Sequence, residues 1–164
     1  MEALLITFSK WLGSTGLSHT IQTVSWIIPT LQTIHILCVA IVFSSAVLVN
    51  LRIFRLFERD EPLGAVARRF LPPIWPVLLV LLVTGSLLII GEPRRSLVNV
   101  TFYLKMSLLL IAILLTAVLQ RTALASPDFF QARQAAGRAL ATASILVWCG
   151  ILFAGRWIAY TQAG

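Results

Sequence analysis

The chain has 164 residues, of which 59% are hydrophobic and only 12% are charged, and its mean hydropathy is +0.92. Soluble domains carry about 25% charged residues, so this composition excludes a soluble domain and predicts an integral membrane protein. The net charge of +7 does not indicate nucleic-acid binding, because the basic residues flank apolar segments, where they set topology and contact lipid.

The first 16 residues predict an amphipathic helix that lies along the membrane surface. Apolar residues recur there at spacings of three and four, with polar residues between them: Leu4, Leu5, Phe8, Trp11 and Leu12. The start is acidic and has no small-residue cleavage site, which is not typical of a secretory signal peptide. We therefore expect an interfacial helix over residues 1–16 that ends at Gly13 or Gly16.

Four segments are long and apolar enough to cross a bilayer, which takes about 20 residues each. They cover residues 27–49, 74–90, 100–119 and 140–160. All six acidic residues lie outside them, as expected if the segments are buried in hydrocarbon. The connections are short and force neighbours to run antiparallel. The sequence thus predicts an all-α fold, an up-down bundle of four transmembrane helices over residues 25–164.

Two local signals describe the fourth segment. Ser126 followed by Pro127 is typical of an N-cap and the first position of a helix. Small residues recur at intervals of four further along: Ala139 and Ala143, then Gly150 and Ala154. This pattern predicts that a neighbouring helix approaches closely along that face.

The basic residues predict the orientation. One side holds eight arginines: Arg52, Arg55, Arg59, Arg68, Arg69, Arg121, Arg133 and Arg138. The other side holds five basic residues: Lys10, Arg94, Arg95, Lys105 and Arg156. Because cytoplasmic loops carry the basic excess, we expect a protein of the bacterial inner membrane with both termini in the periplasm.

Three polar residues inside the segments fall in the same half of the membrane. At about 1.5 Å per residue, His35 lies about 12 Å below the start of the first segment, and Lys105 lies at a similar depth in the third. Arg156 lies just before the end of the fourth segment, on the same side. One imidazole with two cations and no carboxylate suits haem b, which takes an axial imidazole and carries anionic propionates.

The haem hypothesis assigns a role to each residue of this group. His35 is the axial ligand, Lys105 and Arg156 pair with the propionates, and Gln32 or a backbone carbonyl orients the imidazole. Met106 is one candidate for the second ligand, beside a five-coordinate iron or a site shared across a homo-oligomer. His19 would lie about 24 Å from His35 along a continuous helix, so the two could bind one iron only if the chain folded back near residues 16–18.

Other interpretations remain open at this point. His35 could simply bond a neighbouring helix, while Lys105 and Arg156 extend to the interface. The protein would then be a non-catalytic anchor or assembly subunit with partner subunits in a larger complex, or a copper-handling protein with His35, Cys38 and Met106 as soft ligands. The absence of carboxylates from the segments disfavours a proton-coupled transporter, and no Ser/His/Asp set indicates a hydrolase.

A set of short motifs between residues 25 and 120 carries a family resemblance. It comprises His35 in the first segment and four later runs: Asn50-Leu51-Arg52, Leu71-Pro72, Thr84-Gly85 and Phe102-Tyr103-Leu104-Lys105. With these the chain resembles a family of small bacterial four-helix membrane proteins of unknown function, distantly similar to the CopD copper-resistance domain and to HemJ. The similarity to HemJ implies bound haem and a functional site that includes His35 and Lys105. The chain departs from the family pattern at two places. It has Asn50 where an acidic residue is usual, and it has no histidine at residues 119–121, where one is usual.

Overall fold

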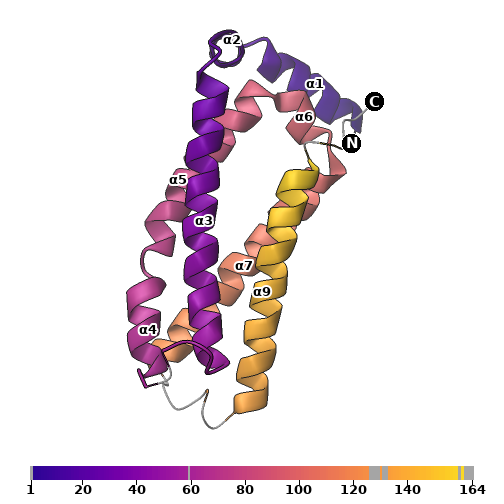
Figure 1. Ribbon diagram of the computed structural model, residues 1–164. Coiled ribbons are helices and arrows are strands. Elements are labelled where there is room, and N and C mark those ends of the chain that lie inside the picture. Colours follow the sequence, from indigo (N-terminus) through magenta and orange to yellow (C-terminus); the bar gives the residue numbers. More distant parts are fainter. Residues whose placement is uncertain (1, 59, 126–129, 131–132, 159, 161–164) are drawn as a thin grey trace.

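The computed structural model describes residues 2–58, 60–125, 130, 133–158 and 160, and these residues form helices and turns without any strand. Within them, four helical spans are long and apolar enough to cross a membrane. The spans are α3 (Ile27–Ile53), α4 (Leu63–Phe70) continued by α5 (Ile74–Gly91), α7 (Val100–Ala125) and α9 (Gln134–Trp157). They lie side by side in an up-down bundle, which confirms the predicted fold class (Figure 1).

The ends of the helices differ from those of the segments that hydropathy predicts. Both α3 and α7 extend beyond their predicted ends, and α9 begins at Gln134 and ends at Trp157. The second span bends at residues 71–73, where two prolines separate α4 from α5. The predicted helix start at Ser126 and Pro127 lies outside the described residues.

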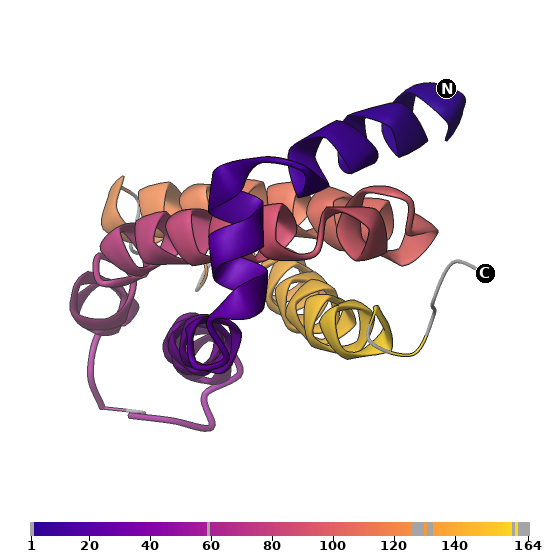
Figure 2. The same cartoon turned by 90° about the horizontal axis from the view of Figure 1, so that it is seen from above.

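Three short helices cross the end of the bundle at which α9 ends, here called the terminal end. They are α1 (Glu2–Gly13), α2 (Gly16–Thr23) and α6 (Pro93–Leu97), and α1 packs against α6 (Figures 1 and 2). The first helix ends at Gly13, one of the two residues predicted. The helix α2 was not predicted; it begins where the Thr15 side chain accepts a hydrogen bond from the Ser18 backbone N–H.

The helix α2 caps the last turn of α5. The Ser18 hydroxyl donates to the Ile90 carbonyl at 2.6 Å, and the Gln22 amide donates to the Gly91 carbonyl at 2.9 Å. These carbonyls have no partner within α5, because the last turn of a helix leaves its C=O groups unpaired. Gly91 lets the two helices touch: a Cβ there would lie 2.7 Å from Ile21 Cγ2.

The half of the bundle near α4 is closed around a continuous core. Buried side chains of α3 begin at Val42 and those of α7 at Ala112, and α4 adds Val66 and Ala67. On α9, small residues at intervals of four were predicted to pack against a neighbouring helix. The prediction is wrong for the first two, Ala139 and Ala143, which are exposed. The buried face instead follows a spacing of three and four through other residues: Gly137, Ala141, Ser144, Trp148 and Ile151.

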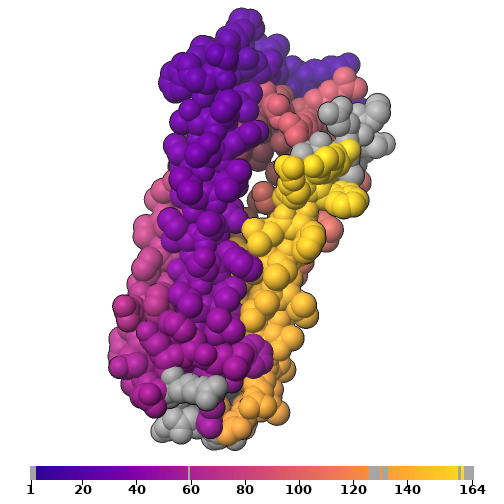
Figure 3. Space-filling view, viewed as in Figure 1, coloured from indigo at the N-terminus to yellow at the C-terminus, as the bar shows by residue number. Residues whose placement is uncertain are grey.

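The terminal half is open. Before Val42 on α3, and before Ala112 on α7, no described residue of these helices is buried. Here the bundle consists of two packed pairs, α3 with α5 and α7 with α9. Figure 3 shows an opening between α3 and α9 in this half, with α7 behind it.

Large apolar side chains cover the outer surface of all four spans. Leu79, Leu110 and Phe153, on three different helices, each expose well over half of their surface. A soluble monomer rarely exposes so much apolar area, whereas hydrocarbon chains favour it. The exposed surface therefore fits a helical bundle embedded in lipid.

We predict that Gly91→Ala lowers the stability of the folded protein, because the new methyl group overlaps the Cγ2 methyl group of Ile21. Overpacking of this kind costs about 1–3 kcal/mol. Gly16→Ala is the matched control, since nothing lies within 4 Å of a Cβ at that position. Thermal unfolding in detergent measures both variants. Equal Tm values for the two would contradict the contact between α2 and α5.

Candidate functional site

The imidazole of His35 is held by Thr84 on α5. The His35 Nδ1 and Thr84 Oγ1 atoms are 2.8 Å apart, and Thr84 Oγ1 also lies 2.8 Å from the Val80 carbonyl oxygen. A hydroxyl has one proton, and a carbonyl can only accept, so Thr84 donates to Val80. Its oxygen then accepts the Nδ1–H of His35. This network places the ring proton on Nδ1 and leaves Nε2 with a free lone pair.

Gly85, the next residue of α5, makes room for the ring. A Cβ at this position would lie 3.4 Å from His35 Cε1, the carbon between the two ring nitrogens. The imidazole is therefore positioned by two consecutive residues of the neighbouring helix. The prediction that Gln32 or a backbone carbonyl orients His35 is corrected here, because the Nδ1 partner is Thr84 and Gln32 is exposed.

Lys105 lies on the facing pair of helices. Its side chain runs past Gly155 of α9, where a Cβ would lie 3.6 Å from both Lys105 Cε and Nζ. The lysine is partly buried. Within the described part of the chain, Lys105 has neither a carboxylate nor a hydrogen-bond partner. The candidate site therefore has an oriented imidazole on one helix pair and an amino group without a partner among the described residues on the other.

The other predicted site residues are not gathered around His35. The Arg156 guanidinium donates to the Tyr160 hydroxyl at 2.9 Å and lies 5.2 Å from the centre of that ring. Met106 is 42% exposed, on a different side of α7 from its neighbour Lys105. Of the five predicted residues, His35 and Lys105 are partly buried, on different helix pairs of the open half, whereas Gln32, Met106 and Arg156 are exposed.

A bare metal ion finds few ligands in this site. Among the described residues, no group of three or more His, Cys, Asp or Glu side chains could hold a metal ion. Cys38 lies one turn from His35 on α3 and is a free thiol. Within the described residues, the site thus offers one imidazole nitrogen as a metal ligand and one amino group as a possible partner for an anion.

Thr84 is the site residue that the sequence analysis missed. It lies seven residues before the end of α5, which corresponds to a depth of about 10 Å from the terminal end. His35 was placed at about 12 Å. A depth comparison that included hydroxyl groups as well as charged groups would have paired the two residues.

We predict that His35 carries its proton on Nδ1, and that Thr84→Val abolishes this preference by removing the acceptor. Thr84→Ser keeps the hydroxyl and should preserve the preference. The ¹⁵N chemical shifts of the labelled imidazole, recorded with His19→Gln to leave one histidine, distinguish the two tautomers. A wild-type ring protonated on Nε2 would show that the hydrogen bond runs the other way.

Comparison with known proteins places the whole bundle in one family. The model of a family described as a family of unknown function (DUF6644) matches residues 8–161. No curated protein and no solved structure matches the chain. The match includes all four spans, together with His35, Thr84 and Lys105. The chain therefore belongs to this family of unknown function.

Proposed function

We propose that the protein binds haem b in the open half of the bundle, with His35 Nε2 as an axial ligand. The hydrogen bond between His35 and Thr84 carries this proposal. Histidines that bind a metal through one nitrogen commonly donate the other N–H to a fixed acceptor, which sets the tautomer and the orientation of the ring. Thr84 supplies that acceptor from a helix packed against α3.

Haem fits the available ligands better than a bare copper ion does. The porphyrin supplies four nitrogen atoms to its iron, so one imidazole from the protein completes a five-coordinate site. Copper would need two or three further protein ligands, and the described residues offer no such group around His35. The scarcity of protein ligands around His35 therefore favours the haem hypothesis over the copper alternative.

Lys105 and the opening between the helix pairs support the same proposal. A haem propionate is an anion, and the unpaired ammonium of Lys105 is a partner for it at the depth of His35. The macrocycle itself is apolar, and it would enter between α3 and α9, where the helices separate (Figure 3). Gly155, which leaves space beside the lysine stem, allows that side chain to reach from α7 along α9.

The chain's own residues would hold and orient the group. Bound haem would supply a one-electron iron couple, which suits electron transfer or the handling of a tetrapyrrole in the membrane. His35 would fix the iron, Lys105 would fix one propionate, and the surrounding spans would exclude water. We further propose that the protein resides in the bacterial inner membrane with the terminal end in the periplasm, as the arginine distribution indicates.

We predict that His35→Ala abolishes haem binding, because no other imidazole lies within a span. His19→Ala is the matched control: His19 is exposed on α2 and should be dispensable. Titration of the detergent-purified variants with haem, followed by absorbance and by a pyridine haemochrome assay, measures the bound fraction. A full complement of haem in His35→Ala would rule out this ligand.

We also predict that Lys105→Met weakens haem retention by roughly ten- to a hundredfold, the effect of losing one charge-assisted hydrogen bond. Lys105→Arg keeps the charge and should retain most of the affinity. Arg156→Met provides the comparison at the end of α9, where the guanidinium is engaged with Tyr160. The dissociation rate of haem to a scavenger protein measures all three variants. Equal rates for Lys105→Met and Arg156→Met would contradict the role of Lys105.

A further inference from the structure

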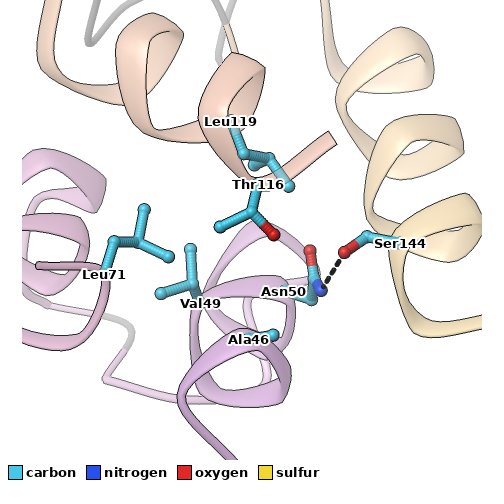
Figure 4. A pocket seen from close by; sticks show the side chains of 7 residues that line it. All are labelled: Ala46, Val49, Asn50, Leu71, Thr116, Leu119 and Ser144. Carbon is cyan, nitrogen blue, oxygen red and sulfur yellow. Dashed lines mark hydrogen bonds between the residues drawn. The ribbon is translucent and has the colours of Figure 1, made fainter. Parts of the chain in front are cut away.

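The closed half of the bundle contains a small polar cavity, remote from His35. It measures about 10 Å³ and is lined by Asn50, Thr116 and Ser144, together with four apolar side chains (Figure 4). Asn50 lies about 22 Å further along α3 from His35, at 1.5 Å per residue. The cavity is therefore separate from the proposed haem site.

One oxygen atom at this cavity lacks a hydrogen bond. Asn50 is 1% exposed, and its amide nitrogen donates to Ser144 Oγ at 3.1 Å. Its Oδ1 atom is buried and has no partner in the described part of the chain. An amide oxygen left unpaired in an apolar environment costs on the order of 1–3 kcal/mol. Figure 4 shows this oxygen facing the space beside the Thr116 hydroxyl.

The two hydroxyl groups have unused hydrogen-bonding capacity. Ser144 Oγ accepts from Asn50, yet its own proton has no acceptor among the described residues, and the same is true of Thr116. A water molecule can donate to Asn50 Oδ1 and exchange hydrogen bonds with both hydroxyls. That makes three partners, the usual number for a buried water.

The size and charge of the cavity select water over other ligands. A volume of about 10–15 Å³ is what one water molecule needs, so an organic ligand does not fit. Hard cations take six or more oxygen ligands, with carboxylates among them, whereas this cavity offers three neutral oxygens. We propose that one water molecule is bound here and joins α3, α7 and α9 through Asn50, Thr116 and Ser144.

A structure of the full-length protein at a resolution that shows ordered water tests the proposal directly. We expect a single peak about 2.5–3.0 Å from Asn50 Oδ1 and Thr116 Oγ1. Thr116→Ser keeps the hydroxyl and should keep the peak, whereas Thr116→Val should lose it. An empty cavity in the wild type, a protein donor on Asn50 Oδ1, or a peak with the short distances of a metal ion would each overturn the proposal.

Thermal unfolding gives a second test that needs no structure. Thr116→Val should lower the Tm of the wild type, but it should have little effect in an Asn50→Leu background, where the water has already lost its principal acceptor. Asn50→Val, which removes the same acceptor, replaces Asn50→Leu in the cycle if the latter does not fold. Equal losses of Tm from Thr116→Val in the two backgrounds would contradict a shared water.

Discussion

The structure depends on one constraint: hydrocarbon provides no hydrogen-bond partner, so each polar group within a span must find one inside the protein. Ser18 and Gln22 meet this requirement for the last carbonyls of α5, and Asn50 pairs with Ser144 across two helices. His35 pairs with Thr84 for the same reason. Because the acceptor is a hydroxyl already committed to Val80, the bond also decides which ring nitrogen stays free.

The two halves of the bundle have different physical roles. Near α4, Val42, Val66 and Ala112 belong to one buried core, which provides most of the helix packing. In the terminal half the same helices separate into two pairs, and His35 and Lys105 lie on different pairs. The proposed haem site lies between the two pairs, away from the packed half. The fold thus combines a closely packed end with a more open one.

Hydropathy predicted the four spans well, but it predicted their ends and faces poorly. The apolar signal stops where the hydrocarbon would stop, whereas α3 continues through Arg52 because helical hydrogen bonds do not require apolar side chains. The helix α2 was missed because its sequence is mostly polar and its stability comes from contacts with α5. On α9, exposed alanines had the same spacing as buried ones, so spacing alone could not identify the packed face.

The site was predictable in part. The depth of a residue can be counted along its helix, but the sequence does not say which face of that helix packs against its neighbours. His35 and Lys105 lie in the same half of the bundle, as their depths along the helices indicated. Gln32, Met106 and Arg156 share that half, yet they lie on exposed surfaces. The choice among them depends on which face of each helix is packed, and packing is a property of the whole bundle. Thr84 was missed because a hydroxyl carries no charge, and only charged groups were compared by depth.

The visible absorption spectrum of the detergent-purified wild-type protein, before and after reduction with dithionite, tests the central claim most directly. If haem is bound, we expect a Soret band that shifts and sharpens on reduction, together with an iron content near one atom per chain. A colourless protein that contains no iron and takes up no added haem would contradict the claim. His35 and Thr84 would then form a structural contact between α3 and α5.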